Sequence, residues 1–121
     1  MKVFLISPVR DVSSDYYRLA KLYVETLEAK GVTVHWPIRD TNQNDKTGFN
    51  ICVENCKAIR EADEVHIIWD GKSQGSMFDL GIAFCWWSIF GTKKIVPVEL
   101  PLPTEGKSFQ NMIMEWSKRN E

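Results

Sequence analysis

The chain has 121 residues, with 15 lysines and arginines against 16 aspartates and glutamates and a formal net charge of −1. This length predicts one domain, residues 1–121, and the balanced charge argues against a strongly basic surface of the kind that binds nucleic-acid polymers. No apolar run approaches the roughly 18 residues of a membrane span, and Pro8 and Arg10 interrupt the opening too early for a signal peptide, so we expect a cytoplasmic protein without membrane contact.

Strands and helices alternate in the first half of the chain. The run KVFLIS, residues 2–7, is short and almost continuously apolar, which is typical of a buried strand. Residues 13–31 carry apolar side chains at a spacing of three and four, between a serine N-cap and a glycine stop, and predict an amphipathic helix. The β-branched run VTVHW, residues 32–36, predicts a second strand. The polar residues 39–48 then predict a long loop that suits a lid over a site.

The alternation continues to the end of the chain. The expected elements are a helix over 49–63, a strand over 64–69, a helix over 76–91, a strand over 93–100 and a helix over 107–120. Because parallel strands need crossover connections, this order predicts a three-layer α/β sandwich with a parallel sheet of four to five strands. Ligands bind such sheets at the carboxyl ends of the strands, near the point where the strand order reverses. The loops of interest are residues 7–11, 38–48, 70–79 and 99–108.

A candidate anion site follows the third predicted strand. Residues 72–76 read KSQGS, and Ser73, Gly75 and Ser76 are small enough for backbone N–H groups to reach an anion at the start of the next helix. Neither a Walker loop nor a GxGxxG motif is present. Asp79 comes next, in the first turn of the predicted helix. On spacing alone, a carboxylate favoured by the helix dipole and a functional carboxylate explain Asp79 equally well.

Four segments carry a family resemblance through their order and spacing. They are FLISPVR, AIREADEVHIIWDG, GSMFDLGIAF before the basic strand KKIV, and KSFQNMI, and together they span most of the chain. The chain resembles the nucleoside 2-deoxyribosyltransferase-like family, which includes deoxynucleoside 5′-monophosphate N-glycosidases. The resemblance implies a flavodoxin-like or Rossmann-like fold. It also implies a small-molecule nucleoside or nucleotide substrate, no cofactor or metal, and a homo-oligomer, dimer or larger, with a shared site.

The reaction that the resemblance implies is glycosyl transfer or hydrolysis at C1′ through a carboxylate nucleophile and a covalent sugar intermediate. Asp79 stands in the place of the family's usual Glu and is one methylene shorter. Asn55 stands where the family's transferases carry an Asp that handles the base, and an amide cannot act as a general acid or base. Phe4 lies near the place of a family tyrosine. These departures leave open a catalytically weak or inactive nucleotide-binding or sensing module.

The resemblance also implies residues that bind substrate. Ser73, six residues before Asp79, matches a serine that the monophosphate-cleaving members use for the 5′-phosphate, and Ser7 and Arg10 fall where those members place first-loop phosphate contacts. A solvated loop position explains Arg10 equally well. Ser108 resembles a position that completes the site of a neighbouring subunit, although its spacing also fits the N-cap of the last helix.

Other chemistry-bearing residues favour structural roles. His35 and His66 lie in predicted strands without the companions of a catalytic triad. The three cysteines lack CxxC or zinc-site spacing, so we expect buried, reduced thiols. Residues 84–90, FCWWSIF, are apolar all round, which predicts either a helix sealed within the fold or a subunit interface. A flavodoxin-like domain for another ligand, such as a flavin, remains a third reading.

Overall fold

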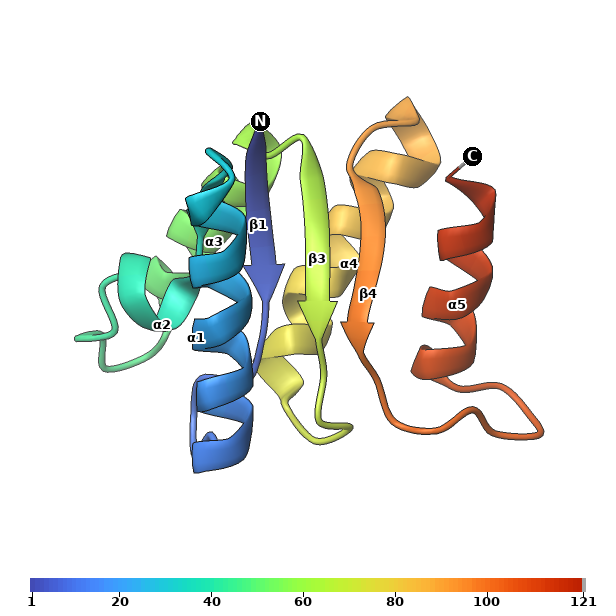
Figure 1. Ribbon diagram of the computed structural model, residues 1–121, viewed down its shortest axis with the longest axis horizontal. Coiled ribbons are helices and arrows are strands. Elements are labelled where there is room, and N and C mark those ends of the chain that lie inside the picture. The colour runs from blue at the N-terminus through green and yellow to red at the C-terminus, as the bar shows by residue number, and fades with distance from the viewer. Residues whose placement is uncertain (121) are drawn as a thin grey trace.

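The computed structural model describes residues 1–120 and confirms the predicted alternation of strands and helices (Figure 1). The elements in chain order are β1 (Lys2–Ile6), α1 (Ser14–Ala29), β2 (Thr33–His35), α2 (Pro37–Asp40), α3 (Phe49–Glu61), β3 (Glu64–Ile68), α4 (Gln74–Phe90), β4 (Lys94–Glu99) and α5 (Phe109–Arg119). The four strands form one fully parallel sheet in the order β2-β1-β3-β4. The predicted α/β class is therefore correct, with the sheet at the lower end of the expected size.

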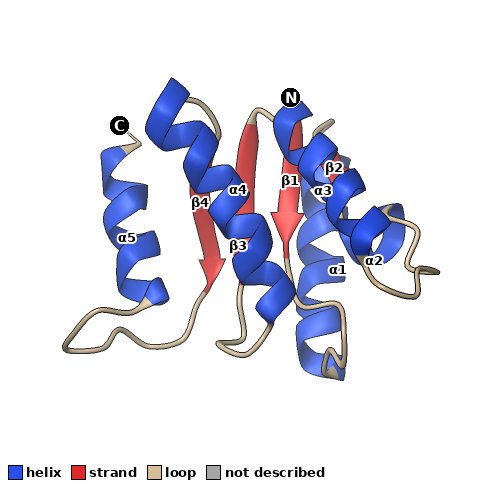
Figure 2. Cartoon of the chain, turned by 180° about the vertical axis from the view of Figure 1, so that it is seen from behind, coloured by secondary structure: helices blue, strands red, loops and turns tan. Residues whose placement is uncertain are grey.

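Helices cover both faces of the sheet. α1 packs on one face and α3 and α4 on the other, while α5 lies beside the edge strand β4, on the side of α4 (Figures 1 and 2). Successive side chains of a strand point to opposite faces, so Phe4 and Ile6 join the core under α3 and α4, whereas Val3 and Leu5 join the core under α1. All four are almost fully buried, which explains the unbroken apolar run of β1.

The strand order reverses between β1 and β3. The chain passes from β1 through α1 to β2 on one side, then through α3 to β3 on the other side of β1. The carboxyl ends of these two central strands therefore border the crevice where open α/β sheets bind ligands. Ser7 directly follows β1, and the short loop after β3 leads into α4. This topology brings two of the predicted site segments to one edge of the sheet.

α4 begins earlier than the sequence predicts. Its first residue is Gln74, and Ser73 is the N-cap, whose side chain accepts a hydrogen bond from the backbone N–H of Ser76. Asp79 therefore lies in the second turn, and the prediction that placed it in the first turn was wrong. The macrodipole acts mainly on the first turn, so a helix-terminus charge no longer explains this carboxylate.

Two expectations about exposure need correction. Cys56 and Cys85 are exposed and Cys52 is half-buried. The prediction of buried thiols was therefore wrong. The outer side of α4 also reaches solvent, because Ile89 and Phe90 are 65% and 63% exposed. The segment 84–90 is therefore not sealed within this chain. No helix in the described part of the chain has both the length and the apolar character needed to cross a membrane.

Candidate functional site

Asp79 is a buried carboxylate at the centre of the candidate site. The buried residues of α4, Ser76, Asp79, Leu80 and Ala83, recur at helical spacing and form the side that packs on the sheet. Asp79 is only 8% exposed. Burial raises the pKa of Asp79 to about 7, and a hydrogen bond from Asn55 acts in the opposite direction. Its ionised and neutral forms are therefore both populated near neutral pH.

Asn55 brings α3 to this carboxylate. The Asn55 side chain is buried, and its Nδ2 donates to Oδ2 of Asp79 at 3.4 Å, a long hydrogen bond. Its Oδ1 accepts a hydrogen bond of 2.7 Å from the Thr41 hydroxyl. The structure thus brings together the two residues that the sequence assigns to catalysis.

The polar chain continues beyond the residues found by sequence. Thr41 is only 3% exposed, and its Oγ1 lies 2.8 Å from Nε2 of His35. His35, Thr41, Asn55 and Asp79 therefore form one chain of hydrogen-bonded side chains. From the sequence, Thr41 is expected in a loop and His35 in a structural role, so neither connection was predicted.

The short helix α2 returns Thr41 to the site. Pro37 occupies the first helical position, where its missing N–H has no consequence, and Asp40 accepts a hydrogen bond of 2.8 Å from the backbone N–H of Trp36. The predicted long loop is shortened by this turn, because residues 37–40 are helical. Proline at the first helical position is the sequence signal that indicates such a turn.

Ser73 and Ser76 form the beginning of α4. The Ser73 hydroxyl oxygen accepts hydrogen bonds from the backbone N–H of Ser76 at 3.2 Å and from the Ser76 hydroxyl at 2.8 Å. Asp70 fixes the preceding loop by accepting from the backbone N–H groups of Lys72 and Ser73, each at 2.8 Å. Gly75 lies in ordinary helical backbone, and a Cβ added there would meet no atom within 4 Å. Neither backbone strain nor close packing therefore requires glycine at this position.

The first-loop candidates lie differently from one another. Ser7 is buried directly after β1, and its Oγ accepts a hydrogen bond of 3.2 Å from Nε1 of Trp36. Arg10 is exposed, in the turn that precedes α1. Within residues 1–120, no hydrogen bond joins either residue to Asp79.

Ser108 is the N-cap of α5, as its spacing predicts. Its Oγ accepts from the backbone N–H of Asn111 at 3.1 Å. The next residue, Phe109, makes an edge contact with Trp69, whose Nε1 donates to the backbone oxygen of Ser73 at 3.3 Å. The start of α5 therefore adjoins the loop that leads into α4.

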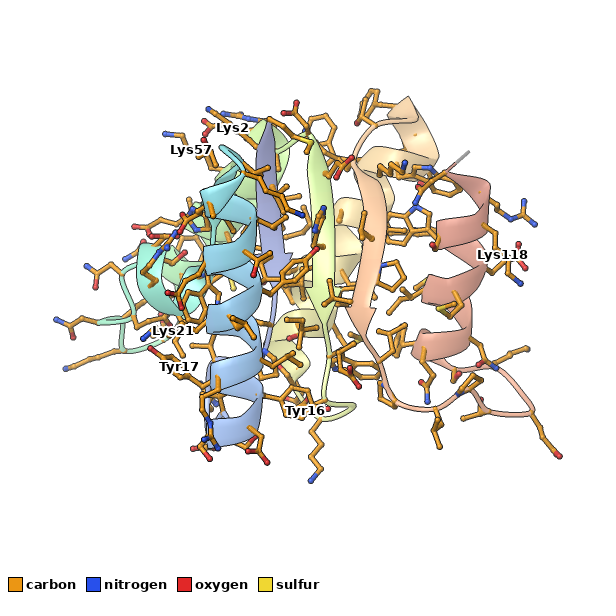
Figure 3. The ribbon with its side chains drawn as sticks, viewed as in Figure 1. Lys2, Tyr16, Tyr17, Lys21, Lys57 and Lys118 are labelled. Atoms are coloured by element: carbon orange, nitrogen blue, oxygen red, sulfur yellow. The ribbon has the colours of Figure 1, made fainter. Side chains whose placement is uncertain are left out.

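Two hollows open on the surface away from Asp79. The larger, of about 180 Å³, includes Lys2, His35 and Asp40 in its lining, and Figure 3 places Lys2 at the amino end of β1. The smaller, of about 120 Å³, is lined by Asp15, Tyr16, Leu19 and Glu99. Tyr16 lies at the carboxyl edge of the sheet (Figure 3), where burial, Asp70 and Glu99 raise its pKa. Asp79 lines neither hollow.

Within the residues that the structure describes, no three side chains of His, Cys, Asp or Glu gather closely enough to hold a metal ion. The groups that surround Asp79 are the amide of Asn55 and, through it, the hydroxyl of Thr41.

Comparison with known proteins gives the fold. No family model matches the chain, and no curated protein sequence matches it. A 2-deoxyribosyltransferase from Bacillus psychrosaccharolyticus superposes with a TM-score of 0.64 at 15% identity, covering 99% of this chain and 90% of that one. A conserved protein from Enterococcus faecalis V583 gives a TM-score of 0.63 at 19% identity, covering 100% and 75%. At these identities the likeness confirms the predicted resemblance at the level of the fold.

Proposed function

We propose that this protein cleaves or transfers the N-glycosidic bond of a (deoxy)nucleoside or its 5′-monophosphate, with Asp79 as the nucleophile. The observation that carries the proposal is a buried carboxylate beside the strand-order reversal of a sheet with the fold of a 2-deoxyribosyltransferase. Asn55 holds Oδ2 of this carboxylate, and no hydrogen bond in the described residues engages Oδ1. Oδ1 is therefore the oxygen available for attack.

The proposed reaction has two displacement steps. Oδ1 of Asp79 forms a bond to C1′ while the C1′–N bond breaks and its electron pair leaves with the base. Water or a second base then attacks C1′, and the carboxylate is released as the leaving group. Asn55 stabilises the ionised carboxylate but cannot protonate the departing base, because an amide is not an acid in this range. Water or an ionisable group of the substrate itself supplies that proton.

The start of α4 suits the 5′-phosphate of the substrate. The first backbone N–H groups of a helix, here those of Gln74 and Gly75, have no acceptor within the helix. The Ser73 oxygen already accepts two hydrogen bonds, so its own proton is available to a ligand, and the Ser76 hydroxyl supports it. Ser7 and Arg10 add a hydroxyl and a guanidinium from the first loop. In this proposal residues 42–48, the loop that follows Thr41, move to admit the sugar to Asp79, while Thr41 keeps its contact with Asn55.

Gly75 offers a direct test of phosphate binding. We expect Gly75→Ala to raise the free energy of unfolding by roughly 0.5–1 kcal/mol, because alanine is the better helix former, and to weaken binding of a deoxynucleoside 5′-monophosphate by about tenfold, because its methyl group crowds the phosphate. Chemical denaturation and calorimetry measure the two effects. Gly81→Ala is the matched control, since Gly81 lies in the same helix with equally open surroundings. Equal binding by both variants would show that the phosphate does not bind beside Gly75.

The activity itself is tested by incubating the full chain with deoxynucleosides, ribonucleosides and their 5′-monophosphates. Free base is measured by chromatography, and base exchange is measured after a second, labelled base is added. We expect base release that is greater for the monophosphate than for its nucleoside. Binding of these compounds without any free or exchanged base would reject the proposed enzyme.

That last outcome defines the second candidate, a nucleotide-binding or sensing module without turnover. It is favoured by the amide at Asn55 and by the burial of Asp79 away from the two hollows. Calorimetry separates the candidates, because nucleotide binding with no product supports the module. The absence of any binding would contradict both.

We further propose that the protein is a homo-oligomer in which Ser108 contributes to a partner's site. The support is the exposed apolar side of α4, where Phe84, Ile89 and Phe90 are at least 36% exposed. Sedimentation velocity measures the state in solution, and a monomer at micromolar concentration would contradict the proposal.

A further inference from the structure

We infer that His35 and Thr41 are positioning residues that hold the Asn55 carboxamide with its NH₂ group facing Asp79. The inference deepens the proposed function, on which its kinetic consequence rests, but its structural content holds for any role of the carboxylate. The supporting distances are 2.8 Å from His35 to Thr41 and 2.7 Å from Thr41 to Asn55. Thr41 and Asn55 are both more than nine-tenths buried, so water does not replace these partners freely.

The number of available protons determines which side chain donates and which accepts in each of these hydrogen bonds. The Thr41 hydroxyl has one proton, which it donates to Oδ1 of Asn55. Its contact with His35 at 2.8 Å must then use a proton on Nε2 of the imidazole. This assigns His35 the neutral tautomer that carries its proton on Nε2. With Oδ1 occupied by Thr41, the Asn55 amide has only its NH₂ group to offer to Asp79.

The surroundings of His35 support a neutral ring in a fixed plane. Phe4 stacks on the imidazole with a centroid distance of 5.4 Å and an interplanar angle of 8°. Burial lowers the pKa of His35, and it outweighs the opposing effect of nearby carboxylates. The charged groups that act on this ring are Asp40, Glu54, Glu61 and Arg39, the last of which also disfavours the imidazolium. A ring held in this way presents the same nitrogen to Thr41.

The orientation of the Asn55 carboxamide decides whether the ionised or the neutral form of Asp79 is favoured. With NH₂ toward the carboxyl, Asn55 stabilises the ionised form, which is the form required for attack at C1′. If the carboxamide were reversed, its oxygen would accept a hydrogen bond from the O–H of neutral Asp79, and its NH₂ would donate a hydrogen bond to Thr41. Thr41 would then donate to a His35 ring that carries its proton on Nδ1. The two arrangements therefore differ in which nitrogen of His35 carries the proton, Nε2 in the first and Nδ1 in the second.

That difference in tautomer can be measured directly. In the wild-type chain at pH 9, where Asp79 is ionised, ¹⁵N NMR of labelled histidine should report the proton of His35 on Nε2. A proton on Nδ1 at this pH would overturn the inference, because the chain would then run in the opposite direction.

The variant Thr41→Val tests the consequence for Asp79. Valine keeps the size of threonine but removes the hydroxyl, so the carboxamide is no longer held and its oxygen can turn toward Asp79. We expect the pKa of Asp79, followed by ¹³C NMR of the carboxyl carbon, to rise by about one unit, a modest change that fits the long Asn55 contact. We expect Thr41→Ser, which restores a hydroxyl, to return the pKa to the wild-type value. If the proposed reaction occurs, the acidic limb of its pH–rate profile moves with that pKa.

Each outcome decides the question. An unchanged pKa in Thr41→Val, or no recovery in Thr41→Ser, overturns the inference. If Thr41→Val fails to fold, the pair His35→Gln and His35→Met replaces it, since glutamine retains an N–H donor and methionine does not; the pKa should then rise only in His35→Met. A shift of the pKa in a protein that releases no base refutes the proposed enzyme and leaves the positioning role intact.

Discussion

Asp79→Asn should abolish base release by the proposed mechanism, with a loss on the order of 10³-fold or more, because the variant lacks the carboxylate that this mechanism uses to attack C1′. Asparagine has nearly the same shape as aspartate, so the buried site can keep its packing, and Asn55 retains an acceptor if the new amide turns its oxygen toward it. The rate of base release from a deoxynucleoside 5′-monophosphate, measured under single-turnover conditions, checks the expectation. Base release at an undiminished rate would exclude Asp79 as the nucleophile.

The same variant should be more stable than the wild type above pH 7. The pKa of Asp79 is about 7 in the folded chain against an ordinary value of 3.8. The unfolded chain therefore releases this proton near pH 4, while the folded chain keeps it until about pH 7. Stability falls as pH rises through this window, by up to roughly 4 kcal/mol when the whole shift is counted. Asparagine carries no charge and removes this loss.

Urea denaturation at pH 4 and pH 8 measures that difference. We expect Asp79→Asn and the wild type to have similar stability at pH 4, and the variant to be more stable at pH 8. Asp15→Asn is the control, because the Asp15 side chain is 89% exposed and the substitution removes the same charge from the surface instead of from the core. Equal effects of pH on Asp79→Asn and the wild type would show that the buried carboxylate does not resist ionisation.

The sequence predicts the fold well because the apolar pattern and the capping residues of each segment favour the same element that the whole fold requires. The run of β1 is apolar at successive positions since both faces of the sheet are covered, and this pattern is readable without coordinates. A serine caps α1 and another caps α5, as predicted, because a serine before an apolar periodic segment satisfies a backbone N–H; of the two candidates Ser13 and Ser14, the structure selects Ser13. The order of strands and helices then leaves few topologies to consider.

The sequence predicts the side-chain contacts around Asp79 less completely than the fold, because these contacts depend on how the elements pack. Asn55 and Asp79 were found through the resemblance, and their contact depends on how α3 packs against α4. His35 and Thr41 lie six positions apart in strand and loop, and only the turn at Pro37 brings their side chains together. The start of α4 was misplaced because both Ser73 and Ser76 are good N-cap residues and the choice depends on the loop before them.

Asn55→Asp would place a second buried carboxyl group beside Asp79, where the present donor and acceptor are 3.4 Å apart. Two neighbouring carboxylates cannot both ionise readily, so the pair should share a proton at pH 5 and lose stability when that proton is removed. We expect stability close to the wild type at pH 5 and a loss of about 2–4 kcal/mol at pH 8, where the pair carries unpaired buried charge. Urea denaturation at both values measures the change.

The control for this variant is Asn50→Asp, which adds the same charge to an exposed position of the same helix and should change stability little at either pH. A loss of stability in Asn55→Asp that is equal at pH 5 and pH 8 would instead indicate disturbed packing. If the proposed reaction occurs, the shared proton gives the pair an acid that the amide lacks. Base release at pH 6 should then rise by about tenfold or more, because protonation of the leaving base is assisted.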